Sequence, residues 1–165
     1  MKVYVASPKG FSELDKIGYM VFLTKLQADA LVDVIDPWAL TSAIEIETAR
    51  LKGLSELHEM DMTCGERNRD GIDESDMVVA ILDGPDVDSG TAAEIGYAYG
   101  IGKKIVGYRG DFRPAGDNAG VTVNLQVEYF IRTSGGTIFS DISTLCKQLF
   151  IFSGDNLRLK HVKNS

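Results

Sequence analysis

The feature that most constrains the fold is the segment DMVVAILDG, residues 76–84, which is apolar at six consecutive positions. A strand that is apolar at every position, rather than at every second one, is typical of a parallel sheet covered on both faces. Three other short runs rich in β-branched residues, at residues 3–5, 31–38 and 103–112, also predict strands. The chain therefore contains the strands of a buried parallel sheet.

Segments with helical spacing of apolar residues separate or follow these strands. The predicted helices cover residues 11–30, 41–74, 91–102 and 141–152. We expect the second of them to break near Cys64 and Gly65. Residues 121–131 fit either a strand or a helix, because β-branched residues are mixed with a segment that can present one apolar face. The alternation predicts an α/β fold, a flavodoxin-like (Rossmann-like) three-layer sandwich around a parallel five-stranded sheet.

Length and charge limit the organisation and the partners. The 165 residues suffice for one compact domain, which we place at residues 1–152, and the more basic residues 153–165 are expected to form a C-terminal tail. The net charge of −7 argues against nucleic-acid and membrane partners, because clustered Lys and Arg hold both. Two cysteines are too few for a secreted disulfide framework, and no signal peptide or membrane-spanning stretch is apparent. We therefore expect a cytoplasmic protein with a small-molecule partner.

The loop DGPDVDSG, residues 83–90, carries three aspartates directly after the most strand-like segment. In doubly wound sheets, ligands bind beyond the carboxyl ends of the strands, so this loop should share one rim with residues 4–10 and 108–113. A phosphate-binding loop combines glycines with backbone amides and often a lysine. Because this loop is acidic and has no neighbouring Lys or Arg, we expect it to repel phosphate and to suit sugar hydroxyls.

Structural roles alone would also explain these acidic residues. The aspartates fit a solvated loop with Asx turns, and Thr91 with Glu94 has the form of a capping box at a helix start. The segment lacks the ligand spacing of a calcium loop, so we predict no metal site. The remaining use is glycosyl chemistry, in which one carboxylate attacks the anomeric carbon and a second acid protonates the leaving group. The candidates for that acid are Asp70, Asp73 and Asp76.

Three blocks of the chain resemble the nucleoside 2-deoxyribosyltransferase family. They are YVASP at residues 4–8, DGPDVDSGTAAEIGYAYGIGKKIVGYRGDFR at residues 83–113 and VNLQVEYFI at residues 123–131, in the order that the family has. The pattern D-x-D-S-G-T-A-x-E-x-G followed by an N-L segment is the most specific part. The resemblance implies a flavodoxin-like enzyme that transfers a 2-deoxyribosyl group from one nucleobase to another, without a cofactor or a metal.

The resemblance also implies three catalytic residues. Glu94 matches the nucleophile, which forms a covalent 2-deoxyribosyl ester, so that two displacements preserve the β configuration. Tyr4 matches a tyrosine that orients this nucleophile, and Asp70 is the best match for the acid near the base, with Asp73 close by. Glu94 must be ionised to attack, which a place in the first turn of a helix would favour. If Glu94 closes a capping box, however, it cannot also point at the sugar.

The predicted substrate-binding residues are Asp88, Asn124, Ser7, Phe11 and Gly90. Asp88 matches the carboxylate that holds the sugar 5′-hydroxyl, and Asn124 matches an asparagine that reaches a neighbouring subunit's site. Phe11, on the rim, is the best candidate for stacking on a base, whereas Trp38 is expected in the core or at a subunit contact. The implied partners are deoxynucleosides, free nucleobases and further copies of the chain, in a dimer or a hexamer.

Two other functions fit part of this pattern. A related hydrolase would cleave deoxynucleoside 5′-monophosphates, but such enzymes tend to carry a small hydroxyl residue where this chain has Asp88. The charge of Asp88 would oppose the phosphate. A non-catalytic nucleotide-sensing module is the other alternative, since a fold does not fix a function.

Overall fold

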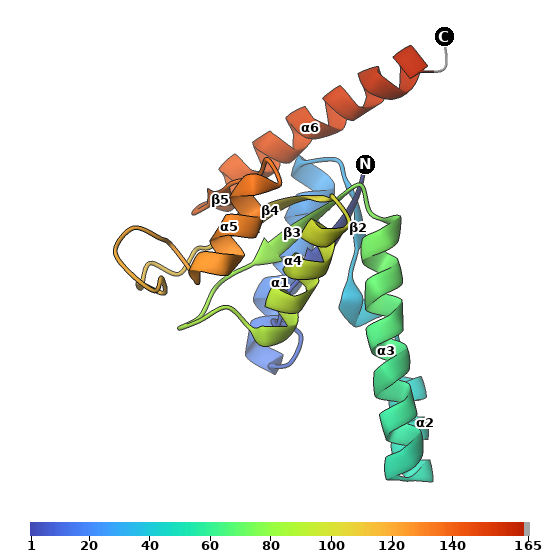
Figure 1. Ribbon diagram of the computed structural model, residues 1–165. Helices are drawn as coiled ribbons and strands as arrows, with labels where there is room; N and C mark the ends of the chain where they lie inside the picture. The colour runs from blue at the N-terminus through green and yellow to red at the C-terminus, as the bar shows by residue number, and fades with distance from the viewer. Residues whose placement is uncertain (164–165) are drawn as a thin grey trace.

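The computed structural model describes the backbone of residues 1–163 and the side chains of residues 1–154. The strands are β1 (Lys2–Ala6), β2 (Asp33–Ile35), β3 (Met77–Ile81), β4 (Lys104–Tyr108) and β5 (Ile138–Phe139). The helices are α1 (Glu13–Asp29), α2 (Ala43–Lys52), α3 (Leu54–Glu74), α4 (Ser89–Gly100), α5 (Leu125–Thr133) and α6 (Ile142–Lys163), with a 3-10 helix η1 (Pro37–Ala39). All strands pair in parallel in the order β2-β1-β3-β4-β5 (Figure 1). The predicted α/β sandwich around a parallel five-stranded sheet is confirmed.

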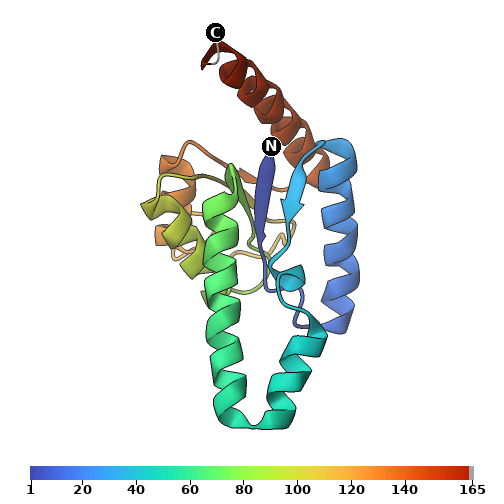
Figure 2. The same cartoon turned by 90° about the vertical axis from the view of Figure 1, so that its right-hand side faces the viewer.

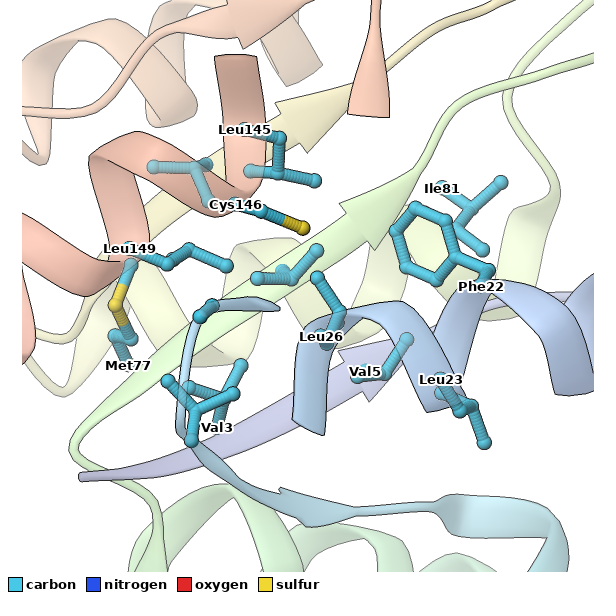
Figure 3. Close-up of a cluster of buried hydrophobic side chains, with 14 of the residues drawn as sticks. Val3, Val5, Phe22, Leu23, Leu26, Met77, Ile81, Leu145, Cys146 and Leu149 are labelled. Atoms are coloured by element: carbon cyan, nitrogen blue, oxygen red, sulfur yellow. The ribbon is translucent and has the colours of Figure 1, made fainter. Parts of the chain in front are cut away.

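Helices cover both faces of the sheet (Figure 1). Because successive strand residues point to opposite faces, Val5 packs with α1 and α6, while Tyr4 packs with α3, α4 and α5. Figure 3 shows the first of these two clusters, in which Leu26 of α1 and Leu149 of α6 lie over the strands. The central strands are buried on both faces, which explains why they are apolar at every position.

The strand order places the topological switch point between β1 and β3. The chain crosses from β1 to β2 on one side of the sheet and from β3 to β4 on the other. The loops that follow β1 and β3, residues 7–12 and 82–88, therefore diverge and leave a crevice at the carboxyl ends of these two strands.

Helices α2 and α3 form a hairpin that extends beyond the sheet (Figure 2). Gly53 separates the two helices with a φ of 131°, a conformation that L side chains rarely adopt. At the other end of α3, Gly71 meets β1, where an added Cβ would lie 3.2 Å from the ring of Tyr4. The missing side chain allows α3 to approach Tyr4 closely.

Two element boundaries in the middle of the chain differ from expectation. The helical break lies at Gly53, while Cys64 and Gly65 are inside α3, because a single glycine within a helix costs only about 1 kcal/mol. The ambiguous residues 121–131 contribute to helix α5, which begins after Asn124, so the helical alternative is the one the chain adopts.

The last strand and helix also differ from expectation. β5 contains only two residues, too few to give a pattern in the sequence. Helix α6 continues to Lys163, past the end of the predicted helix at residue 152, and residues 164 and 165 lie outside the described part. The division into a domain of residues 1–152 and a tail of residues 153–165 stays a prediction. Within the described residues, no helix combines the length and the apolar content that crossing a membrane requires.

Candidate active site

A cavity of about 370 Å³ lies at the carboxyl ends of β1 and β3. Its walls come from the loop after β1, from η1, from the beginning of α2, from α3 and from the start of α4. The lining residues are Ser7, Phe11, Pro37, Trp38, Thr41, Ile46, Asp61, Cys64, Asn68, Asp88, Gly90, Thr91 and Glu94. The cavity therefore brings together five of the predicted site residues, namely Ser7, Phe11, Asp88, Gly90 and Glu94.

Glu94 and Tyr4 form a hydrogen-bonded pair at the wall of this cavity. The Tyr4 hydroxyl donates a 2.6 Å hydrogen bond to Glu94 Oε1. Tyr4 lies in β1 and is fully buried, whereas Glu94 lies in the second turn of α4 and lines the cavity. The buried donor fixes one carboxylate oxygen and leaves the other for a reacting group.

Glu94 does not close a capping box. Helix α4 begins with Asp88 as its N-cap, and the Asp88 side chain accepts a 3.0 Å hydrogen bond from the Thr91 amide. Glu94 is therefore the sixth residue of α4 and lies beyond its first turn. Neither the predicted capping box with Thr91 nor the predicted stabilisation by the first helical turn applies, and the carboxylate is available to the cavity.

The environment of Glu94 brings its titration close to neutral pH. Burial raises the pKa of Glu94 to about 7, the Tyr4 hydrogen bond opposes this rise, and the charge of Asp88 adds to it. Burial and the adjacent Glu94 charge raise the pKa of Tyr4 far above its ordinary value, so Tyr4 stays a hydrogen-bond donor. Glu94 is therefore ionised, and able to act as a nucleophile, mainly above neutral pH.

Phe11 and Trp38 form an aromatic wall of the cavity. Their rings meet edge to face with centroids 4.5 Å apart, and Trp38 Nε1 donates a 3.0 Å hydrogen bond to the carbonyl oxygen of Ser7. An added Cβ at Gly10 would lie 2.1 Å from the Trp38 ring, so only glycine fits where the loop passes the indole. Trp38 packs against the core, as predicted, and it also lines the cavity, which the sequence alone did not indicate.

The loop that carries Asp88 is held by Arg109 at the end of β4. Arg109 is 4% exposed, and its guanidinium donates hydrogen bonds to the carbonyl oxygens of Gly84 at 3.1 Å and of Arg113 at 2.8 Å. The same guanidinium also donates to the carbonyl oxygen of Leu82. Arg109 therefore positions the loop after β3 and is not presented to a ligand.

Asp70 lies outside the cavity that contains Glu94. It pairs with Arg69 at 2.6 Å and lines a separate cavity of about 730 Å³ between α1, β2 and α3. Asn68 faces the Glu94 cavity, and an advance of two residues along a helix turns a side chain by about 200°. The structure consequently does not bring Asp70 and Glu94 into one cavity.

Helix α3 instead lines the cavity with Asp61, Cys64 and Asn68. Their spacing of three and four residues puts them on one face of the helix, which is the signal that the sequence contains. Polar residues occur on the other faces of α3 as well, and Asp73, for example, accepts a 2.7 Å hydrogen bond from Tyr97. The spacing alone therefore does not identify the face that meets the site.

Asn124 does not line the cavity but caps helix α5. Its Oδ1 accepts hydrogen bonds from the amides of Gln126 at 3.0 Å and Val127 at 3.3 Å. The side-chain amide nitrogen takes no part in these two bonds. A contact between Asn124 and a neighbouring subunit's site stays a prediction.

Comparison with known proteins gives one family match. The sequence profile of the nucleoside 2-deoxyribosyltransferase family matches residues 3–126. No curated protein sequence matches the chain. Among solved structures, a conserved protein from Enterococcus faecalis shares 26% sequence identity and has a TM-score of 0.68, over 90% of this chain and 96% of that one.

Two further solved structures are more distant in sequence. A 2-deoxyribosyltransferase from Leishmania mexicana shares 23% identity with a TM-score of 0.59, over 85% of this chain and 90% of that one. A CMP N-glycosidase from Clostridium botulinum shares 17% identity with a TM-score of 0.55, over 92% of this chain and 99% of that one. At these identities, the two likenesses bear on the fold alone.

Proposed function

This chain belongs to the nucleoside 2-deoxyribosyltransferase family, and on that premise we propose that it transfers a 2-deoxyribosyl group between nucleobases through a covalent intermediate on Glu94. The observation that carries the proposal is the Tyr4–Glu94 pair at the wall of a cavity beside the switch point of the sheet. This pair supplies a carboxylate that ionises near neutral pH and is held by a buried donor.

The reaction consists of two displacements at C1′ of the sugar. In the first, a carboxylate oxygen of Glu94 bonds to C1′ while the bond from C1′ to the base breaks, and its electron pair leaves with the base. In the second, a nitrogen of the incoming base attacks C1′, the ester bond returns its electron pair to Glu94, and the proton of the attacking nitrogen passes to solvent. Because Asp70 lies outside the cavity, the proton for the departing base comes from solvent in this scheme.

Deoxynucleosides suit this cavity better than their 5′-monophosphates. Among the described residues that line it, none is Lys, Arg or His, whereas Asp61, Asp88 and Glu94 all carry carboxyl groups. A phosphate placed beside Asp88 would meet a like charge without a compensating cation. The charge distribution therefore favours the transferase over the monophosphate hydrolase.

One chromatographic assay tests this function. Purified protein is incubated with deoxyinosine, with and without adenine, and with deoxyadenosine 5′-monophosphate in parallel. We expect new deoxyadenosine only when adenine is present. Release of adenine from the monophosphate, without any base exchange, would contradict the proposal and support the hydrolase.

Replacing Asp88 by serine should change the choice between nucleoside and nucleotide. Serine retains the ability to cap α4 but removes the charge that opposes a phosphate. We expect the ratio of activity on deoxyadenosine 5′-monophosphate to activity on deoxyadenosine to rise about tenfold, because a like charge near the surface costs on the order of 1–2 kcal/mol. Steady-state kinetics on both substrates measures this ratio.

The matched control for this substitution is Asp86→Ser. Asp86 lies on the same loop but does not line the cavity. Its replacement should leave the ratio unchanged. An equal ratio in Asp88→Ser and wild type would show that Asp88 does not face the 5′ end of the substrate.

A further inference from the structure

We propose that Asp61 of α3 recognises the amino group of the nucleobase, so that the site prefers 6-aminopurines and 4-aminopyrimidines to the corresponding oxo bases. This inference rests on the function proposed above and adds a substrate preference to it. It depends on three observations: the position of Asp61 along α3, its unoccupied carboxylate, and the absence of cations from the described lining of the cavity.

The course of α3 places Asp61 at the end of the cavity far from the reacting carboxylate. Gly71 abuts Tyr4, which holds Glu94, and the cavity-lining residues Asn68, Cys64 and Asp61 follow on successive turns away from it. Ten residues of helix span about 15 Å, so Asp61 is separated from the Tyr4 contact by that rise. In Figure 2, α3 runs away from the sheet toward α2 in this direction.

Part of this 15 Å rise is taken up by the Tyr4 side chain and its hydrogen bond to Glu94, and a deoxynucleoside in the cavity that Glu94 and Asp61 both line lies between the two carboxylates. If C1′ lies against Glu94 and the 5′-hydroxyl lies against Asp88, the base extends away from both, along α3 and past the aromatic wall of Phe11 and Trp38. The edge of the base farthest from the sugar then faces Asp61. In purines this edge carries the substituent at position 6, and in pyrimidines it carries the substituent at position 4.

The Asp61 carboxylate is available for such a contact. Other carboxylates of α3 are engaged within the protein, for example Glu66 and Asp70 with Arg69. In the part of the chain that the structure describes, no hydrogen bond or ion pair occupies Asp61, although it lines the cavity together with Glu94. The thiol of Cys64, one turn nearer to Tyr4, donates a 3.4 Å hydrogen bond to the Thr41 hydroxyl. Asp61 is thus an acceptor without a partner at the base end of the cavity.

The hydrogen-bonding properties of the Asp61 carboxylate allow it to distinguish amino bases from oxo bases. An ionised carboxylate can only accept hydrogen bonds, so it binds an exocyclic amino group. Next to a carbonyl oxygen it would be repelled, because both groups present lone pairs. Asn68 can donate as well as accept, so it does not by itself distinguish the two kinds of base. A hydrogen bond to a charged group at an exposed position corresponds to about a tenfold preference.

The test compares adenine and hypoxanthine as acceptors, with thymidine as the common donor. For the wild type we expect kcat/KM to be about tenfold higher with adenine. Asp61→Asn should reduce this ratio to about one, because an amide can present its NH₂ group to the oxygen of hypoxanthine. The matched control is Glu59→Gln, which removes one carboxyl group from the same helix without touching the cavity and should retain the preference.

A binding measurement separates this inference from the proposed function. Glu94→Gln protein, which cannot form the ester, is titrated calorimetrically with deoxyadenosine and with deoxyinosine, with and without Asp61→Asn. Tighter binding of deoxyadenosine that depends on Asp61 supports the preference even if no exchange occurs in the wild type. Equal binding and equal kcat/KM for the two bases overturn it, while exchange itself would still uphold the transferase.

Discussion

Glu94→Gln is expected to lower base exchange by at least about a thousandfold while the protein remains folded, because the amide cannot form the ester with C1′. Glutamine preserves the size of the side chain and can still accept the hydrogen bond from Tyr4. The rate of deoxyadenosine formation from deoxyinosine and adenine measures the loss. Substantial exchange by the variant would show that another group attacks the sugar.

The same substitution should stabilise the protein at alkaline pH. A carboxyl group whose pKa is raised from 4.5 to about 7 by folding binds its proton more tightly in the folded state. Its contribution to stability is therefore complete below about pH 4.5 and is lost as the pH rises through 7. At pH 8 the loss amounts to about 3 kcal/mol, as an upper figure.

Urea unfolding of both proteins at pH 8 and near pH 4.5 measures this contribution. Glu94→Gln should have the higher free energy of unfolding at pH 8, and the two proteins should differ little near pH 4.5. A variant that is less stable than the wild type at pH 8 would mean that the ionised Glu94 side chain stabilises the fold rather than destabilising it.

Tyr4→Phe should shift the pH dependence of exchange to higher pH. The Tyr4 hydroxyl donates to Glu94 Oε1 and lowers the pKa of Glu94, so its removal leaves the effects of burial and of the Asp88 charge unopposed. A hydrogen bond to a charged group contributes about 1.5–3 kcal/mol, which corresponds to an upward shift of one to two pH units. At pH 7, where the wild-type carboxyl group is about half ionised, the variant should therefore lose roughly five- to fiftyfold in kcat/KM and recover most of this loss at pH 9.

The control for Tyr4→Phe is Tyr19→Phe. Tyr19 is also buried, but its hydroxyl donates a 2.7 Å hydrogen bond to Asp36 rather than to Glu94. Its removal should leave the acidic limb of the kcat/KM profile in place. A profile that is unchanged in Tyr4→Phe, or equally shifted in Tyr19→Phe, would contradict a specific action of Tyr4 on the nucleophile.

The sequence predicts the central part of the fold because each of those elements contains its own signal. Strand β3 is apolar throughout, since helices cover both faces of the sheet, and this pattern is typical of a buried parallel strand. In contrast, β5 has only two residues, and its position in the sheet depends on its pairing with β4. The break between α2 and α3 lies at Gly53, whose positive φ cannot be predicted from the neighbouring residues. Gly65, where the sequence predicts the break, lies within α3.

Some residues of the candidate site can likewise be predicted from the sequence, whereas others depend on tertiary packing. Glu94 and Asp88 lie in one contiguous segment, and the rule for parallel sheets places that segment at the ligand-binding edge. Trp38 and Asp61 reach the cavity through the packing of η1 and α3, so their contribution depends on contacts between segments that are distant in sequence. The position of Asp70 depends on the rotation of α3 about its own axis, which periodicity does not determine.

The most direct test of the central claim is to trap the sugar on the enzyme. Protein incubated with deoxyinosine, without an acceptor base, is quenched in acid, digested and analysed by mass spectrometry, with Glu94→Gln treated in parallel. We predict that the mass of one 2-deoxyribosyl group is added to Glu94 in the wild type and is absent from the variant. Exchange that proceeds with no adduct, or with an adduct on another residue, would contradict a covalent intermediate on Glu94.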